Sequence, residues 1–281
     1  MFKTFKRLAG SAVILAAAVS GAYAQDGGVW GKIESSGQMN CGVVTDTIPA
    51  SWKPAGSDKY FGYVPGFCRA MVPDLSKAMG KEIELVYVPT SWATVILDVQ
   101  SGRIDLAGGL SITPERAKAI DMPGPAYVLL DTLLVRKDFP LYKTWDEYNK
   151  PEIRVASTTG TSSERTANEK LPATEKLSFK DRPSMILSLQ SGRADISVSA
   201  FVAALNTMKE APEQFGGWIV PEPPVTQPSA FGVRRDGDGR FNAWVQKWAE
   251  TTRAEGRVKD IIKESFKEAG LDTSNMSGVG D

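Results

Sequence analysis

The chain has 281 residues, with 33 Lys and Arg residues, 33 Asp and Glu residues, two cysteines and no histidine. The lack of histidine excludes the Ser-His-Asp triad, the Cys-His pair and the paired-histidine zinc helix, and two cysteines cannot form a structural zinc site. A formal net charge of zero, with Lys and Arg scattered, provides no basic stripe for phosphates, so nucleic acid is not expected as a partner. We expect one large globular domain or two lobes, without metal or cofactor.

The first 24 residues have the three zones of a secretory signal peptide. Basic residues within positions 1–7 precede an apolar run over residues 8–19, and the segment ends in the A-x-A sequence of residues 22–24. This apolar run is too short to cross a hydrocarbon core of about 30 Å as a stable anchor. We therefore expect cleavage before Gln25 and release of the mature chain into the periplasm.

Export places Cys41 and Cys68 in an oxidising compartment, where a disulfide can persist. We predict a bridge between them, which would connect the first strand to the start of the first helix. The alternative is two buried thiols that pack as small hydrophobic side chains.

The mature chain begins with alternating strands and helices. Residues 42–44 and 82–88 are rich in β-branched side chains and predict strands, and residues 65–80 between them have helical periodicity. A second helix is predicted over residues 92–101, ended by Gly102. This β-α-β order predicts an α/β fold.

One pattern occurs twice, at residues 95–106 and 185–196. Each copy is an amphipathic helix that ends in Gln-Ser-Gly-Arg and leads into a buried strand. Two copies predict two similar α/β lobes, and the alternative is chance similarity between two capped helices.

The lobe boundaries follow from two segments, residues 133–138 and 231–236, that both run from an apolar strand into a charged turn. If these strands cross between the lobes, lobe 1 comprises residues 30–134 and 230–281, and lobe 2 comprises residues 135–229. Such crossing strands would form a hinge that closes around a ligand. Apolar residues at helical spacing in the C-terminal segment, residues 240–270, predict core packing.

In lobe 1, a strand runs through Gly109 and Ser111 into a predicted helix start. Free backbone N–H groups and hydroxyls converge at such a turn and favour an anion. Arg116 adds a planar guanidinium that matches a carboxylate. The alternative is ordinary capping by Thr113 with a solvated Arg116.

In lobe 2, hydroxyl-bearing residues again gather where a strand leads into a helix, at Thr161 and Ser162. Thr161 is the predicted cap, and Glu164 three residues later predicts a capping box. The two helix starts would face each other across the cleft between the lobes.

These motifs together resemble the solute-binding proteins of polar amino acid ABC importers, family 3. The resemblance is carried by Gly-Arg-Ile-Asp-Leu-Ala-Gly-Gly-Leu-Ser-Ile-Thr-Pro-Glu-Arg at 102–116, by Gly66-Phe67, by the helix that begins at Trp92 and by Gly160-Thr161, and it covers about residues 38–270. It implies the two-lobed periplasmic binding protein fold of type II, with a mixed sheet flanked by helices in each lobe and two crossing strands as the hinge. It also implies a monomer that works with the membrane subunits of an ABC importer.

The resemblance implies roles for individual residues. The arginine matching Arg116 pairs with the ligand α-carboxylate, whose shell is completed by the lobe 1 strand and the lobe 2 turn. Asp46 matches an acid after the first strand, and Trp92 matches an aromatic residue that covers the ligand side chain. The predicted ligand-binding residues are Asp46, Trp52, Trp92, Gly109, Ser111, Arg116, Thr161, Ser162 and Ser199.

The chain departs from the family where an acidic residue should hold the ligand α-amino group, because Ala200 stands at that position. An ammonium buried without a carboxylate is costly. Either Asp46 takes over the ammonium, or the ligand is a carboxylate without an amine. The aromatic residue expected just after Asp46 is also replaced, by Pro49-Ala50, with Trp52 beyond.

We expect a non-enzymatic periplasmic protein that captures a small carboxylate-bearing solute, an amino acid or an amine-free organic acid, and delivers it to an ABC importer. One alternative is an exported enzyme on the same scaffold, of the cyclohexadienyl dehydratase type. It would need a general acid in the cleft, for which Asp46 and Glu164 are the candidates. The other alternative is a ligand sensor without transport.

Overall fold

A computed structural model of the protein describes residues 27–272, so the expected signal peptide lies outside the described residues. In this range the main sheet has nine strands: β1 (Gln38–Val44), β4 (Glu84–Thr90), β5 (Leu106–Ser111), β6 (Tyr127–Arg136), β7 (Arg154–Thr158), β8 (Glu175–Phe179), β9 (Ile196–Ala200), β10 (Phe215–Ile219) and β11 (Thr226–Gly232). A small hairpin is formed by β2 (Asp46–Thr47) and β3 (Ser51–Trp52).

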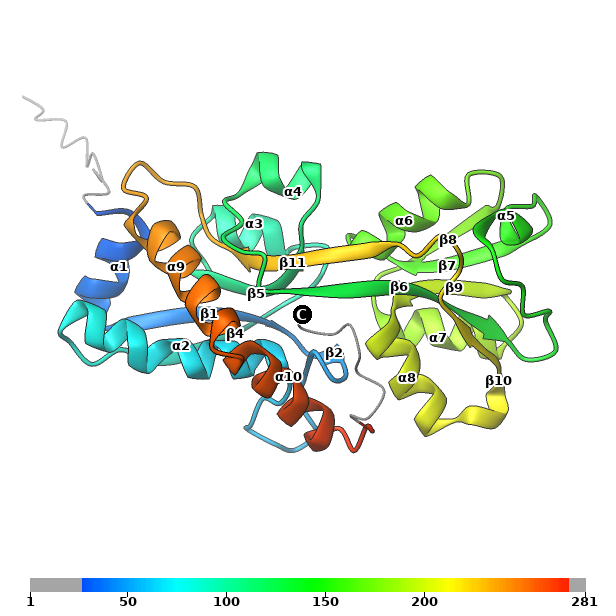
Figure 1. The fold of residues 1–281 in the computed structure, drawn as a ribbon, viewed down its shortest axis with the longest axis horizontal. Coiled ribbons are helices and arrows are strands. Elements are labelled where there is room, and N and C mark those ends of the chain that lie inside the picture. The colour runs from blue at the N-terminus through cyan, green and yellow to red at the C-terminus, as the bar shows by residue number, and fades with distance from the viewer. Residues whose placement is uncertain (1–26, 273–281) are drawn as a thin grey trace, which may run out of the picture.

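The helices divide into two groups (Figure 1). Beside β1, β4 and β5 lie α1 (Gly28–Ser36), α2 (Tyr63–Met79), α3 (Val95–Gln100), α4 (Pro114–Ala119), α9 (Arg240–Ala254) and α10 (Arg257–Glu268). Beside β7, β8 and β9 lie α5 (Trp145–Tyr148), α6 (Ser162–Lys170), α7 (Arg182–Gln190), α8 (Phe201–Glu210) and the short 3₁₀ helix η1 (Pro212–Gln214). We refer to the first group as lobe 1 and to the second as lobe 2. The predicted α/β fold of the periplasmic binding protein type is confirmed.

The strand order β4-β1-β5-β11-β6-β9-β7-β8, with β10 also beside β6, joins the lobes through β6 and β11. Figure 1 shows these two long strands running side by side from one lobe to the other. β6 pairs with β11 over Tyr127–Leu130 and with β9 over Asp131–Val135. The expected lobe boundaries, residues 134 and 230, lie inside these two strands.

Both copies of the repeat form the expected helix followed by a strand, α3 with β5 and α7 with β9. The glycine after each helix, Gly102 or Gly192, has a left-handed backbone with φ of 73° or 70°, which glycine adopts without strain. The helix predicted from Trp92 begins only at Val95, after a turn in which the backbone N–H groups of Thr94 and Val95 both donate to the Ser91 carbonyl, at 3.1 and 2.9 Å.

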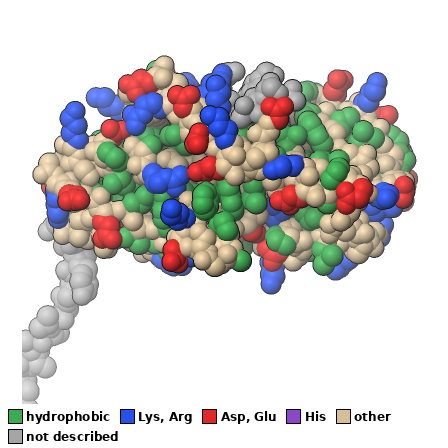
Figure 2. Space-filling model, turned by 90° about the horizontal axis from the view of Figure 1, so that it is seen from below, with side chains coloured by type: hydrophobic (Ala, Val, Ile, Leu, Met, Phe, Trp, Pro, Cys, Tyr) green, Lys and Arg blue, Asp and Glu red, His purple; other side chains and the backbone are tan. Residues whose placement is uncertain are grey.

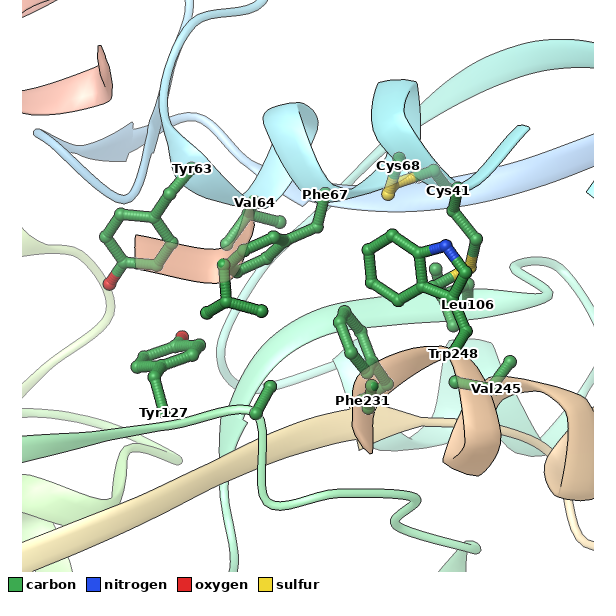
Figure 3. Packing of buried hydrophobic residues seen from close by; sticks show 14 of the residues in the cluster. Cys41, Tyr63, Val64, Phe67, Cys68, Leu106, Tyr127, Phe231, Val245 and Trp248 are labelled. Atoms are coloured by element: carbon green, nitrogen blue, oxygen red, sulfur yellow. A yellow bond between two sulfur atoms is a disulfide. The ribbon is translucent and has the colours of Figure 1, made fainter. Parts of the chain in front are cut away.

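The predicted disulfide between Cys41 and Cys68 is present and joins β1 to α2 within the core of lobe 1. Figure 3 shows it near Trp248 and Leu106. The C-terminal helices α9 and α10 contribute buried side chains to the same core, as their helical spacing predicted.

The face of the molecule shown in Figure 2 carries positive and negative side chains intermixed with apolar ones. None of the helices within residues 27–272 is long and apolar enough to cross a membrane.

Candidate ligand-binding site

A cavity of about 90 Å³ lies between the lobes and is lined by both of them. We call it the interlobe cavity. Seven of the nine predicted ligand-binding residues line it: Trp92, Gly109, Ser111, Arg116, Thr161, Ser162 and Ser199.

Arg116 is buried at the lobe 1 side of this cavity. Thr113 caps α4 by accepting the backbone N–H of Arg116 at 3.3 Å, which brings the arginine back toward the end of β5. Its guanidinium donates from Nη1 to the Ser111 carbonyl and from Nη2 to the Gly160 carbonyl, both at 2.9 Å. Capping and placement in the cavity therefore occur together, and Arg116 is only 7% exposed, not solvated.

The charge of Arg116 is poorly compensated. Burial lowers the pKa of its guanidinium to about 10, the positive charge of Arg165 adds to this effect, and Glu115 opposes it. A pKa near 10 still leaves the side chain positively charged at neutral pH, so the cavity has a permanent cation on its wall.

The lobe 2 turn meets lobe 1 directly. The Ser162 hydroxyl donates to the Ser111 hydroxyl oxygen at 3.0 Å, and the Gly160 carbonyl accepts from Arg116. Both contacts cross between the lobes, so the structure has the closed arrangement in which a ligand would be enclosed.

Thr161 caps α6, because its hydroxyl accepts the N–H of Glu164 at 3.1 Å. The reciprocal half of the predicted capping box is wrong. The Glu164 carboxylate accepts the N–H of Gly160 at 2.8 Å and the hydroxyl of Ser178 at 2.7 Å. The preceding glycine turn brings its own N–H within reach of this carboxylate.

Asp46 and Trp52 do not line the interlobe cavity. The β2–β3 hairpin presents Thr47 and Ala50 to the cavity, and Trp52 stacks on Phe61 with ring centroids 5.6 Å apart. Asp46 reaches across to lobe 2, where its Oδ2 accepts the N–H of Arg182 at 3.4 Å.

Arg182, which the sequence analysis missed, lines the lobe 2 side of the interlobe cavity. It is the first residue of α7, and its Nη2 donates to the Ala203 carbonyl at 2.5 Å and to the Thr207 hydroxyl at 2.7 Å. Burial lowers the pKa of Arg182 to about 10, while the carboxylates of Asp46 and Glu210 oppose the shift. A signal was available, since alignment of the two repeat copies places Arg182 opposite Trp92.

The remaining walls add hydroxyl groups and apolar surface. The hydroxyl of Ser199 is buried in the cavity wall without a hydrogen-bond partner in the described part of the chain. A ligand atom would satisfy it. Apolar contacts come from residues that the sequence analysis did not single out, among them Tyr63, Leu129, Met185 and Val202. Within residues 27–272, no group of three or more His, Cys, Asp or Glu side chains could hold a metal ion.

The fold and the interlobe cavity define a two-lobed solute-binding protein with an arginine at the junction of its lobes. The chain belongs to the bacterial extracellular solute-binding proteins, family 3, which match residues 39–268. The resemblance seen in its motifs is thereby confirmed.

Relatives with established names are distant but span most of the chain. The L-cystine-binding protein TcyJ of Escherichia coli is 26% identical and covers 91% of this chain and 92% of its own length. Cyclohexadienyl dehydratase of Pseudomonas aeruginosa is 24% identical, with 94% and 95% covered. The crystal structure of the ancestral amino acid-binding protein AncCDT-1, a precursor of cyclohexadienyl dehydratase, superposes with a TM-score of 0.73 at 28% identity, covering 84% of this chain and 98% of that one. Most of the named relatives are binding proteins, and one is an enzyme.

Proposed function

We propose that the protein is a periplasmic receptor that captures a small carboxylate-bearing solute between its lobes and delivers it to an ABC importer. The observation that carries this proposal is Arg116, a buried cation on the cavity wall whose hydrogen bonds go only to uncharged carbonyl oxygens. A carboxylate placed against its planar fork would add the charge compensation that the site lacks. Binding of amino acids by relatives supports the same use of the cavity.

Closure couples this capture to recognition by the importer. The contact between Ser162 and Ser111 and the contact between Arg116 and Gly160 form only when the lobes meet. A ligand that touches Arg116 and the Thr161–Ser162 turn would bind the closed arrangement better than an open one. The difference in affinity shifts the population toward the closed form, which is the form to be recognised by the membrane subunits.

The test compares Arg116→Met with Arg193→Met, which removes an exposed arginine away from the cavity. Thermal shift of the mature protein against the standard amino acids and their deaminated carboxylates would identify ligands, and calorimetry would measure their affinities. We expect Arg116→Met to weaken binding about 100-fold, the scale of a lost bidentate charge-assisted contact, and Arg193→Met to leave it unchanged. Equal affinity in the wild type and Arg116→Met would contradict the proposal.

The residues of the interlobe cavity give less support to the alternative function, a dehydratase. Neither candidate general acid, Asp46 or Glu164, belongs to its wall. Prephenate and arogenate should therefore not be turned over by the purified protein, and their dehydration would favour the dehydratase instead.

A further inference from the structure

We propose that the ligand of the interlobe cavity is an amine-free dianion, a small dicarboxylate held by Arg116 at one carboxylate and by Arg182 at the other. This inference rests on the proposed function and specifies the class of solute.

The charges on the cavity wall favour an anionic ligand. Among the described residues, its wall contains two arginines and no Asp or Glu. The hydrogen bonds of both guanidinium groups go to uncharged oxygens, two carbonyls for Arg116 and a carbonyl and a hydroxyl for Arg182. The carboxylates of Asp46 and Glu210 act on Arg182 from outside the described cavity wall, but none lies in that wall between the two cations, and a dianion there would relieve the cost of burying them.

Asp46 is a carboxylate that contacts Arg182 from across the cleft. Its Oδ2 accepts the first backbone N–H of α7, and its Oδ1 accepts the Thr47 hydroxyl at 3.1 Å. A negative charge is favourable at this helix N-terminus. Asp46 thus contacts α7 from outside the cavity wall and does not present a carboxylate to the ligand.

Ala200, at the end of β9, lines the cavity with a methyl group and offers no carboxylate to a ligand amine. An ammonium there would meet a methyl group and two guanidinium cations. A ligand without an amine avoids this repulsion, and its carbon chain would contact the apolar side chains of Met185 and Val202 instead.

The test uses isothermal titration calorimetry on the mature protein with the straight-chain α,ω-dicarboxylates from malonate to adipate. Each dicarboxylate is compared with its own monoamide, which has nearly the same size and one charge fewer, and with the standard amino acids. We expect at least one dicarboxylate to bind about tenfold or more tightly than its monoamide, the scale of one charge-assisted hydrogen bond. The same dicarboxylate should bind more tightly than every amino acid.

Substitutions of Arg182 test whether this residue binds the second carboxylate of the ligand. Arg182→Met should reduce the preference for the dicarboxylate over its monoamide to about one, Arg182→Lys should retain part of it, and the surface control Arg193→Met should keep all of it. Circular dichroism of each variant checks that the fold is intact. Because the monoamide comparison uses the wild-type protein, it stands even if a variant does not fold.

Three results would overturn the inference: no dicarboxylate binds, an amino acid binds more tightly than every dicarboxylate, or Arg182→Met keeps the full preference. If Arg116→Met still weakens carboxylate binding about 100-fold in the second or third case, the proposed function survives and only the dianion assignment fails. If Arg116→Met changes nothing, the proposed function fails as well.

Discussion

The two copies of the repeat have the same role in folding and different roles in the cavity. In lobe 1, Asp105 precedes β5 and accepts the backbone N–H of Asn40 on β1 at 2.9 Å. In lobe 2, Asp195 precedes β9 and accepts the backbone N–H of Arg154 on β7 at 3.0 Å. Each aspartate therefore holds the first strand of its lobe beside the strand of the repeat, and this device is duplicated with the fold.

The positions that face the cavity are not duplicated. Alignment of the copies pairs Trp92 with Arg182 and Gly109 with Ser199, and all four line the cavity with different chemistry. Beyond β5 the chain enters α4 and Arg116, whereas β9 leads directly into α8. Lobe 2 therefore has no counterpart of Arg116 after its strand, and its cation comes from the start of α7. The repeat thus preserves the positions that serve folding, whereas the residues that face the cavity differ between its two copies.

The aspartates also differ in their electrostatic surroundings. Burial raises the pKa of Asp105, and its contacts with Lys32 and the Asn40 N–H offset only part of this shift. Burial acts in the same direction on Asp195, but the hydrogen bonds from Arg154 and Arg136 outweigh it and lower the pKa. Asp195 is thus stabilised in its charged form, and Asp105 is not.

The largest effect should come from the disulfide, which only lobe 1 has among the described residues. Cys41 and Cys68 are 27 positions apart, and opening a loop of this length by Cys41→Ala with Cys68→Ala should lower the free energy of unfolding by about 3 to 4 kcal/mol. Urea denaturation would measure the loss. Reductant should have a similar effect on the wild type and none on the double variant, and a wild type insensitive to reductant would contradict the prediction.

The next largest loss of stability should differ between substitutions of the two aspartates. Asp195→Asn leaves two arginines without their shared carboxylate and should cost about 2 to 3 kcal/mol, whereas Asp105→Asn should cost about 1 kcal/mol because the charged form is already disfavoured there. Both free energies of unfolding come from urea denaturation at neutral pH. Equal losses would show that the second arginine adds nothing.

The pH dependence of these losses should have opposite signs. The pKa of Asp195 is lower in the folded protein, so its stabilisation is present above the unfolded pKa of about 3.9 and is lost as the pH falls through the folded value. The pKa of Asp105 is higher in the folded protein, so stability falls as the pH rises from the unfolded to the folded value. Urea denaturation of the wild type and each Asn variant from about pH 3 to 7 would show both slopes. If Asp105 and Asp195 contributed slopes of the same sign to the free energy of unfolding against pH, the predicted difference between them would be wrong.

Much of the fold could be predicted because its signals are local. The Gln-Ser-Gly-Arg ends of α3 and α7 and the short path from β5 to Arg116 are all encoded within a few residues. The position of Asp46 could not be predicted, since it depends on the β2–β3 hairpin meeting α7 from the other lobe. Arg182 lies in lobe 2, far in sequence from the cavity residues of lobe 1, and apart from its alignment with Trp92 nothing local indicates that the start of α7 faces the cavity.

The smallest loss of stability should come from removing the N-cap hydroxyl of α4 or of α6, the two helices that begin beside the cavity. Thr113 accepts the backbone N–H of Arg116 and also bonds the exposed Glu115 carboxylate, whereas Thr161 accepts the N–H of Glu164 and donates to the carbonyl of the buried Thr158 at 2.7 Å. Thr113→Ala should cost about 1 kcal/mol and Thr161→Ala a few tenths more, as judged by urea denaturation. The matched Thr→Ser variants keep the hydroxyl and should recover most of each loss. If serine does not recover the loss at position 161, the methyl group and not the hydroxyl holds this turn. The contact of the turn with lobe 1 would then depend on packing, as would the closure that brings Ser162 to Ser111.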